Sequence, residues 1–110
     1  MRTCILLMRT PVSEEDAERL LGMAKEGAPD VGLYLLGDGV LCARKGQVGY
    51  LGSGVKTALE SGAEVKASAR DLRARGIKPE EIMKGVVQTD DLEGEFLKDA
   101  MERSGRVFSW

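Results

Sequence analysis

The fold is decided at a junction between an apolar stretch and a polar helical stretch, which reads Val65-Lys66-Ala67-Ser68-Ala69-Arg70-Asp71-Leu72-Arg73-Ala74-Arg75-Gly76-Ile77. The pattern up to Ala67 is typical of a buried strand, and the pattern from Ser68 onward is typical of a helix that ends at Gly76. The strand therefore gives way to the helix at Ser68. A side chain in that position lies beside the unpaired N–H groups of the first helical turn.

The same alternation of strand and helix extends along the whole chain. Apolar runs predict strands over residues 3–8, 31–36, 63–67, 86–88 and 106–108. One helical pattern begins at Ser13, and four others cover residues 40–43, 55–60, 68–75 and 92–102. The polar, glycine-rich residues 44–54 are expected to form an exposed loop. Strands that alternate with helices predict one three-layer α/β/α domain over residues 1–110. Its sheet is expected to be mainly parallel, with about five strands, in a flavodoxin-like architecture.

Two helices carry sequence signals that can be checked residue by residue. Ser13 with Asp16 three residues later forms a pattern like a capping box at the start of the first helix. The apolar stripe expected to pack on the sheet from that helix consists of Ala17, Leu20, Leu21 and Ala24. The inward face expected for the last helix consists of Leu92, Phe96, Leu97, Ala100 and Met101.

Composition narrows the possible function classes. The chain has 110 residues and a net charge of -2, without the basic stripe that indicates direct nucleic-acid binding. No apolar run is long enough for a membrane span or a signal peptide, so we expect a cytoplasmic protein without a membrane partner. Two cysteines and no histidine fit a reducing compartment. They exclude histidine-based catalysis and an ordinary Cys/His zinc site, and we expect no metal and no cofactor.

Three stretches together resemble one protein family. They are Leu33-Tyr34-Leu35-Leu36-Gly37-Asp38-Gly39-Val40, residues 68–77 and Val107-Phe108-Ser109-Trp110. In order and spacing they are similar to the DsrE/DsrF/DsrH (Tus) superfamily of small sulfur-relay proteins, and the DsrH or TusB branch is the most similar. The resemblance implies a subunit of a persulfide-transfer system that serves tRNA wobble thiolation or intracellular sulfur oxidation. DsrE-type members carry their sulfur-accepting cysteine where Ser68 stands, so an interaction or structural subunit is more plausible than an enzyme.

The candidate site residues have alternative interpretations. Ser68 is either a binding residue or the N-cap of its helix, since Asp71 follows three residues later. Cys42 is the better candidate of the two thiols because it follows the second strand at the edge where open α/β sheets bind ligands, but it also fits a buried small hydrophobe. Cys4 fits the core. Asp38 and Gly39 either line a pocket at that edge or form an ordinary turn.

Two alternatives to an interaction subunit stay open. One is a direct sulfur carrier that uses Cys42. The other is a small-ligand binder or enzyme of flavodoxin-like architecture that uses the glycine-rich loop 46–54. That loop resembles a phosphate loop, but its Lys56-Thr57 pair is displaced by one residue from the required spacing.

Apolar residues without an obvious place in the core predict an interface. Val48, Tyr50 and Leu51 lie in the glycine-rich loop, and Trp110 ends the sequence. Such groups are usually covered by a partner, and aromatic side chains are the usual anchors. We expect a homo-oligomer, or a hetero-oligomer with DsrE-like and DsrF-like chains, in contact with sulfur-carrier proteins.

Overall fold

The computed structural model describes residues 1–11, 13–27, 29–46 and 50–110, and within these it leaves out the side chains of residues 21, 25 and 50–53. Five strands form one sheet: β1 (Arg2–Leu7), β2 (Val31–Leu35), β3 (Glu64–Ser68), β4 (Val87–Thr89) and β5 (Ser104–Ser109). The helices are α1 (Glu14–Gly27), α2 (Tyr50–Glu60), α3 (Ala69–Ala74) and α4 (Leu92–Glu102). Short 3-10 helices cover Gly37–Ala43 and Pro79–Glu81.

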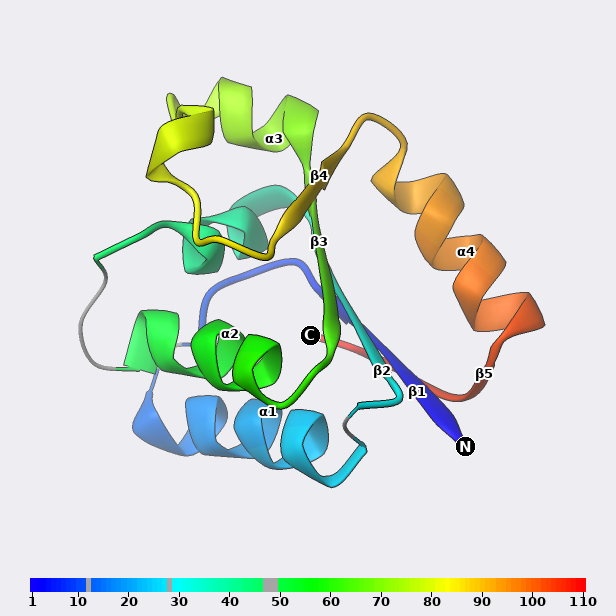
Figure 1. Cartoon of the computed structure of the whole chain (residues 1–110). Helices are drawn as coiled ribbons and strands as arrows, with labels where there is room; N and C mark the ends of the chain where they lie inside the picture. The colour runs from blue at the N-terminus through cyan, green and yellow to red at the C-terminus, as the bar shows by residue number, and fades with distance from the viewer. Residues whose placement is uncertain (12, 28, 47–49) are drawn as a thin grey trace.

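The sheet is entirely parallel, with the strand order β4-β3-β2-β1-β5. Helices α1 and α2 cover one face and α4 covers the other, so the molecule has three layers (Figure 1). The predicted three-layer α/β/α fold is thus confirmed, and residues from all five expected strands lie in one sheet.

Two hydrophobic clusters fill the space between the layers. Alternate residues of β1 point to opposite faces, as the pleat of a strand requires. Ile5 and Leu7 join the large cluster under α1 and α2. Cys4 joins a small cluster under α4 with Tyr34 and Leu92.

The sequence signals predicted for α1 can be compared with its structure. The side chain of Ser13 accepts a hydrogen bond from the backbone N–H of Asp16 at 3.2 Å, which confirms the predicted N-terminal signal of α1. Ala17, Leu20 and Ala24 are buried, as the stripe predicts, and the side chain of Leu21 lies outside the described residues.

Two expectations about helices are wrong. The exposed loop predicted over residues 44–54 is too long, because α2 already begins at Tyr50. In α4, Leu97 and Met101 are exposed, and the buried residues are Leu92 and Asp99, with Phe96 partly buried.

No described helix is both long and apolar enough to cross a membrane.

Candidate functional site

The carboxyl ends of β2 and β3 bring the sequence-predicted polar residues together. Ser68 ends β3 and is almost completely buried. Its hydroxyl accepts a hydrogen bond from the backbone N–H of Asp71 at 3.2 Å, so it is the N-cap of α3. The capping interpretation of Ser68 is therefore confirmed by geometry.

Asp71 connects α3 to the end of β2. Its carboxylate accepts a hydrogen bond from the backbone N–H of Gly37 at 2.7 Å. Burial alone would raise the pKa of Asp71, but the Gly37 N–H, the Arg70 and Arg75 guanidinium groups and the Ser68 bond hold that pKa below its usual value. Asp71 is thus ionised at neutral pH and ties two strand ends together.

Asp38 lies at the outer side of the same edge. Its carboxylate accepts hydrogen bonds from Arg75 Nε at 3.0 Å and Nη2 at 2.8 Å. Asp38 is 65% exposed and Arg75 is 28% exposed. We call Gly37, Asp38, Ser68, Asp71 and Arg75 the Asp71 cluster. It exposes both signs of charge to solvent through Asp38 and Arg75.

Gly39 has a structural reason to be glycine. It is buried, and a Cβ atom there would collide with the backbone carbonyl of Leu7 at the end of β1. The chain can turn this closely past β1 only without a side chain. Gly39 therefore allows the turn that places Asp38 at the edge. Gly39 itself packs against Leu7.

Both thiols lie in the interior. Cys42 is 1% exposed within the cluster under α1 and α2, and burial raises the pKa of its thiol to about 11. Cys4 is fully buried on the opposite face, and burial with the nearby Asp99 carboxylate raises its pKa to about 11. A sulfur acceptor needs an accessible thiolate, which these surroundings disfavour. The reactive role of Cys42 stays a prediction.

The residues predicted for an interface are placed unequally. Tyr50 and Leu51 belong to the first turn of α2, but their side chains, like all of Val48, lie outside the described residues. Trp110 is partly buried against the core cluster under α1 and α2. The glycine-rich loop 46–54 also falls partly outside the described residues, and its second half is helical.

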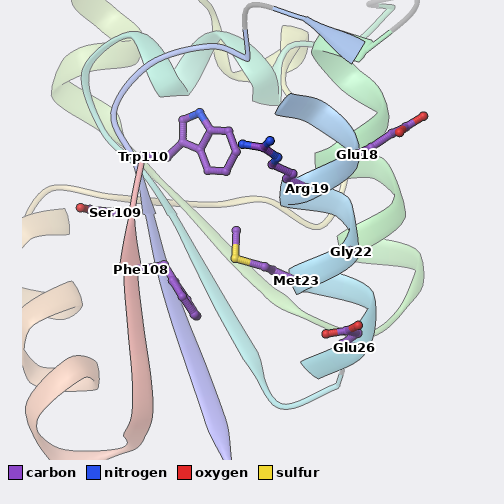
Figure 2. Close-up of a pocket in the computed structure, with 8 residues that line it drawn as sticks. All are labelled: Glu18, Arg19, Gly22, Met23, Glu26, Phe108, Ser109 and Trp110. Carbon is purple, nitrogen blue, oxygen red and sulfur yellow. The ribbon is translucent and has the colours of Figure 1, made fainter. Parts of the chain in front are cut away.

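A groove of about 490 Å³ separates α1 from β5. Figure 2 shows Phe108 of β5 and Trp110, which follows β5, on one side of the groove, with Met23 of α1 between them. The rest of the lining consists of Glu18, Arg19, Gly22, Glu26 and Ser109. Because α1 packs against α2 and β2 and does not cover β5, this groove is open to solvent along the edge strand.

Sequence reasoning missed a buried ionic cluster on the α4 face. Arg2 donates to both carboxylate oxygens of Asp99, each at 2.8 Å. The same carboxylate accepts hydrogen bonds from the Tyr34 hydroxyl at 2.5 Å and the Ser104 hydroxyl at 2.8 Å. We call Arg2, Tyr34, Asp99 and Ser104 the Asp99 cluster, which joins β1, β2, α4 and β5.

The Asp99 cluster has the electrostatics of a permanent ion pair. Burial would raise the pKa of Asp99, but the bonds from Arg2, Tyr34 and Ser104 hold it well below its usual value. The hydrogen bond to Asp99 raises the pKa of Arg2 further above its usual value. Burial and the neighbouring Asp99 also raise the pKa of Tyr34. All four groups therefore keep one protonation state near neutral pH.

Gly32 is the sequence signal that could have indicated this cluster. A Cβ atom at Gly32 would lie 2.6 Å from Arg2 Nη2 and 2.8 Å from Asp99 Oδ2. A glycine inside an apolar strand often marks such a close approach.

Among the described residues, no group of three or more His, Cys, Asp or Glu side chains could hold a metal ion.

Comparison with known proteins supports the architecture. No family model and no curated protein matches the chain. It is similar in structure to the ychN protein of E. coli, with a TM-score of 0.75 and 18% sequence identity over 100% of both chains. It is also similar to MTH1491 of Methanobacterium thermoautotrophicum, a protein of unknown function, with a TM-score of 0.77 and 15% identity over 98% and 99% of the two chains. These likenesses confirm the parallel α/β/α fold over the whole chain.

Proposed function

We propose that this chain is a cytoplasmic, DsrH-like subunit of a sulfur-relay system and that it acts through protein contacts. Its role is to support persulfide transfer between other chains, for tRNA wobble thiolation or intracellular sulfur oxidation. The partners are DsrE-like and DsrF-like chains and sulfur-carrier proteins. The likeness in fold to ychN and MTH1491 supports membership of the superfamily.

The observation that carries this proposal is the placement of Ser68 and of the two cysteines. Ser68 occupies the strand end where DsrE-type relatives have a thiol, and here its hydroxyl caps α3. The pKa of each cysteine is raised to about 11 by its burial. A chain whose thiols are protonated and enclosed fits a supporting subunit better than a carrier.

The exposed side of the Asp71 cluster, formed by Asp38 and Arg75, is the surface that we assign to a relay partner. Arg70 and Arg73 extend it along α3, both about two-thirds exposed, and their acidic neighbours Glu93 and Asp90 are also exposed. These ion pairs span 3.7 and 3.8 Å and are exchangeable with charges on another protein. Partner binding can therefore replace them at little cost in folding free energy.

The test is a reconstituted transfer assay that contains a cysteine desulfurase, a DsrE-like and a DsrF-like chain, and this chain. We expect sulfur transfer to require this chain and to continue unchanged when it carries Cys4→Ala with Cys42→Ala. Circular dichroism checks that the double variant is folded. Loss of transfer with a folded Cys42→Ala variant would favour direct carriage by Cys42.

A further inference from the structure

β5 is one of the two edge strands of the sheet, and at six residues it is twice as long as the other, β4. All residues of β2 are buried, whereas every residue of β5 except Ser104 is exposed. β5 ends the strand order next to β1, and its main contacts are with β1 and α4, so its other edge pairs with no strand among the described residues. Val107 is 48% exposed and Phe108 is 39% exposed. An exposed apolar edge strand of this kind is a template for pairing with another strand.

The direction of the free backbone groups follows from the contact with β1. The Trp110 N–H donates to the carbonyl of Leu6, and the Trp110 carbonyl accepts from the N–H of Met8, each at 2.8 Å. Backbone groups of successive strand residues point to opposite edges. Val107 and Ser109 therefore direct their N–H and C=O groups away from the sheet.

The register of a self-pairing is restricted by three observations. Pairing with β1 is irregular between Ser104 and Arg106, which leaves Arg106 to Trp110 as the regular stretch. An antiparallel pair centred on Arg106 would place two like charges opposite each other. A pair centred on Val107 would use the irregular Gly105. A pair centred on Ser109 would join only three residues of the regular stretch, whereas the pair centred on Phe108 uses all five.

The register centred on Phe108 is chemically complementary. It joins Val107 to Ser109 of the second copy through their outward backbone groups, and it places the two Phe108 rings side by side. Arg106 then lies opposite Trp110 of the second copy, a cation next to an aromatic face. Arg106 is exposed and has no ion pair within the described residues. Among the described residues, the groove that Trp110 lines has two carboxylates, Glu18 and Glu26, and one cation, Arg19, so its charge is complementary to Arg106 of the second copy.

We propose that two copies of this chain associate through antiparallel pairing of their β5 strands about a twofold axis at Phe108, forming one continuous ten-stranded sheet from two five-stranded sheets. This inference goes beyond the proposed function, because it uses a different edge of the molecule and does not depend on sulfur transfer. The occupant is a second copy, since the β5 edge is complementary to itself.

The first test removes the outward N–H of Val107. We expect sedimentation velocity to show a dimer for the wild type and for Val107→Thr, which keeps the N–H group and a β-branched shape. Val107→Pro should weaken self-association about tenfold or more, since proline cannot donate to the new ladder. A wild type that stays monomeric at about 100 µM, or a folded Val107→Pro protein that dimerises as tightly as the wild type, would overturn the proposal.

The second test exploits the twofold axis and decides the matter if the proline variant does not fold. Phe108→Lys and Phe108→Glu each place like charges opposite each other and should be monomeric when purified alone. Their equimolar mixture should recover the dimer. A mixture that associates no more than either variant alone would contradict pairing at Phe108. Val87→Lys, on the opposite edge strand β4, is the matched control and should leave the dimer intact.

Discussion

The Asp99 cluster and the Asp71 cluster use the same kinds of groups for different ends. In both clusters, carboxylates accept hydrogen bonds from residues far away in the sequence. Asp99 accepts from Arg2, Asp71 accepts from the Gly37 N–H, and Asp38 accepts from Arg75. In the Asp99 cluster Arg2 is 7% exposed and Asp99 is 2% exposed. In the Asp71 cluster, Asp38 is largely exposed. The Asp99 cluster is thus enclosed in the fold, whereas the Asp71 cluster joins the buried Ser68 and the largely buried Asp71 to the exposed Asp38.

This comparison predicts its largest effect at Asp99. Replacing Asp99 by alanine leaves the buried Arg2 guanidinium without its main partner, and such changes cost about 3–5 kcal/mol. Urea unfolding followed by circular dichroism measures the loss. The matched control is Asp90→Ala, which breaks an exposed contact with Arg73 and should change the free energy of unfolding by less than about 0.5 kcal/mol. Equal losses in the two variants would remove the distinction between the clusters.

Acid should reveal the same difference. Because the folded-state pKa of Asp99 is lowered, its stabilisation is complete above the unfolded pKa of about 4 and is lost as pH falls toward the folded pKa. We expect about 2 kcal/mol of the acid-induced loss to come from this group. Unfolding experiments between about pH 6 and pH 2 should show a shallower pH dependence for Asp99→Asn. Parallel curves for variant and wild type would disprove the assignment.

Replacing two glycines by alanine should change the stability of the protein in opposite directions. Gly32→Ala forces a methyl group against the Arg2–Asp99 pair and should destabilise the protein by about 1–3 kcal/mol. Gly22→Ala, in the interior of α1, meets nothing within 4 Å and should stabilise the protein by about 0.5–1 kcal/mol. Thermal unfolding of both variants gives the comparison. A neutral Gly32→Ala would mean that the cluster tolerates added volume.

The smallest of these effects is expected at the Asp71 cluster. Ser68→Ala removes the N-cap of α3 and should cost about 1 kcal/mol, while Ser68→Thr keeps a hydroxyl cap and serves as control. Partner binding should be unchanged in the alanine variant. A Ser68→Ala protein with full stability but without relay activity would show that Ser68 has a functional role beyond capping.

The sequence predicted those features that depend on local pattern. The five strands, the parallel three-layer arrangement and the Ser68 cap follow from runs of apolar residues and from a spacing of three residues. The Asp38–Arg75 contact spans 37 positions, and nothing local indicates it. The start of α2 was missed because the glycines between residues 50 and 54 disfavour a helix in isolation, whereas packing of Val55 and Ala58 in the core favours it.

The buried face of α4 shows why hydrophobicity alone was misleading. Leu97 and Met101 were expected to face inward because they are apolar, yet Asp99 is buried and they are exposed. A carboxylate can be buried only where a partner satisfies it, and that partner, Arg2, lies 97 positions away. Arg2 in an apolar strand and Gly32 in another were the only local signs of the pair.

We propose that this chain supports a sulfur relay without carrying sulfur itself. Intact-mass spectrometry after incubation with a cysteine desulfurase and cysteine tests it most directly, with a DsrE-like chain in the same mixture as the positive control. We predict that the DsrE-like chain gains the mass of a sulfur atom while the folded chain gains none on Cys4 or Cys42. A sulfur adduct on Cys42 of the folded chain would contradict the account.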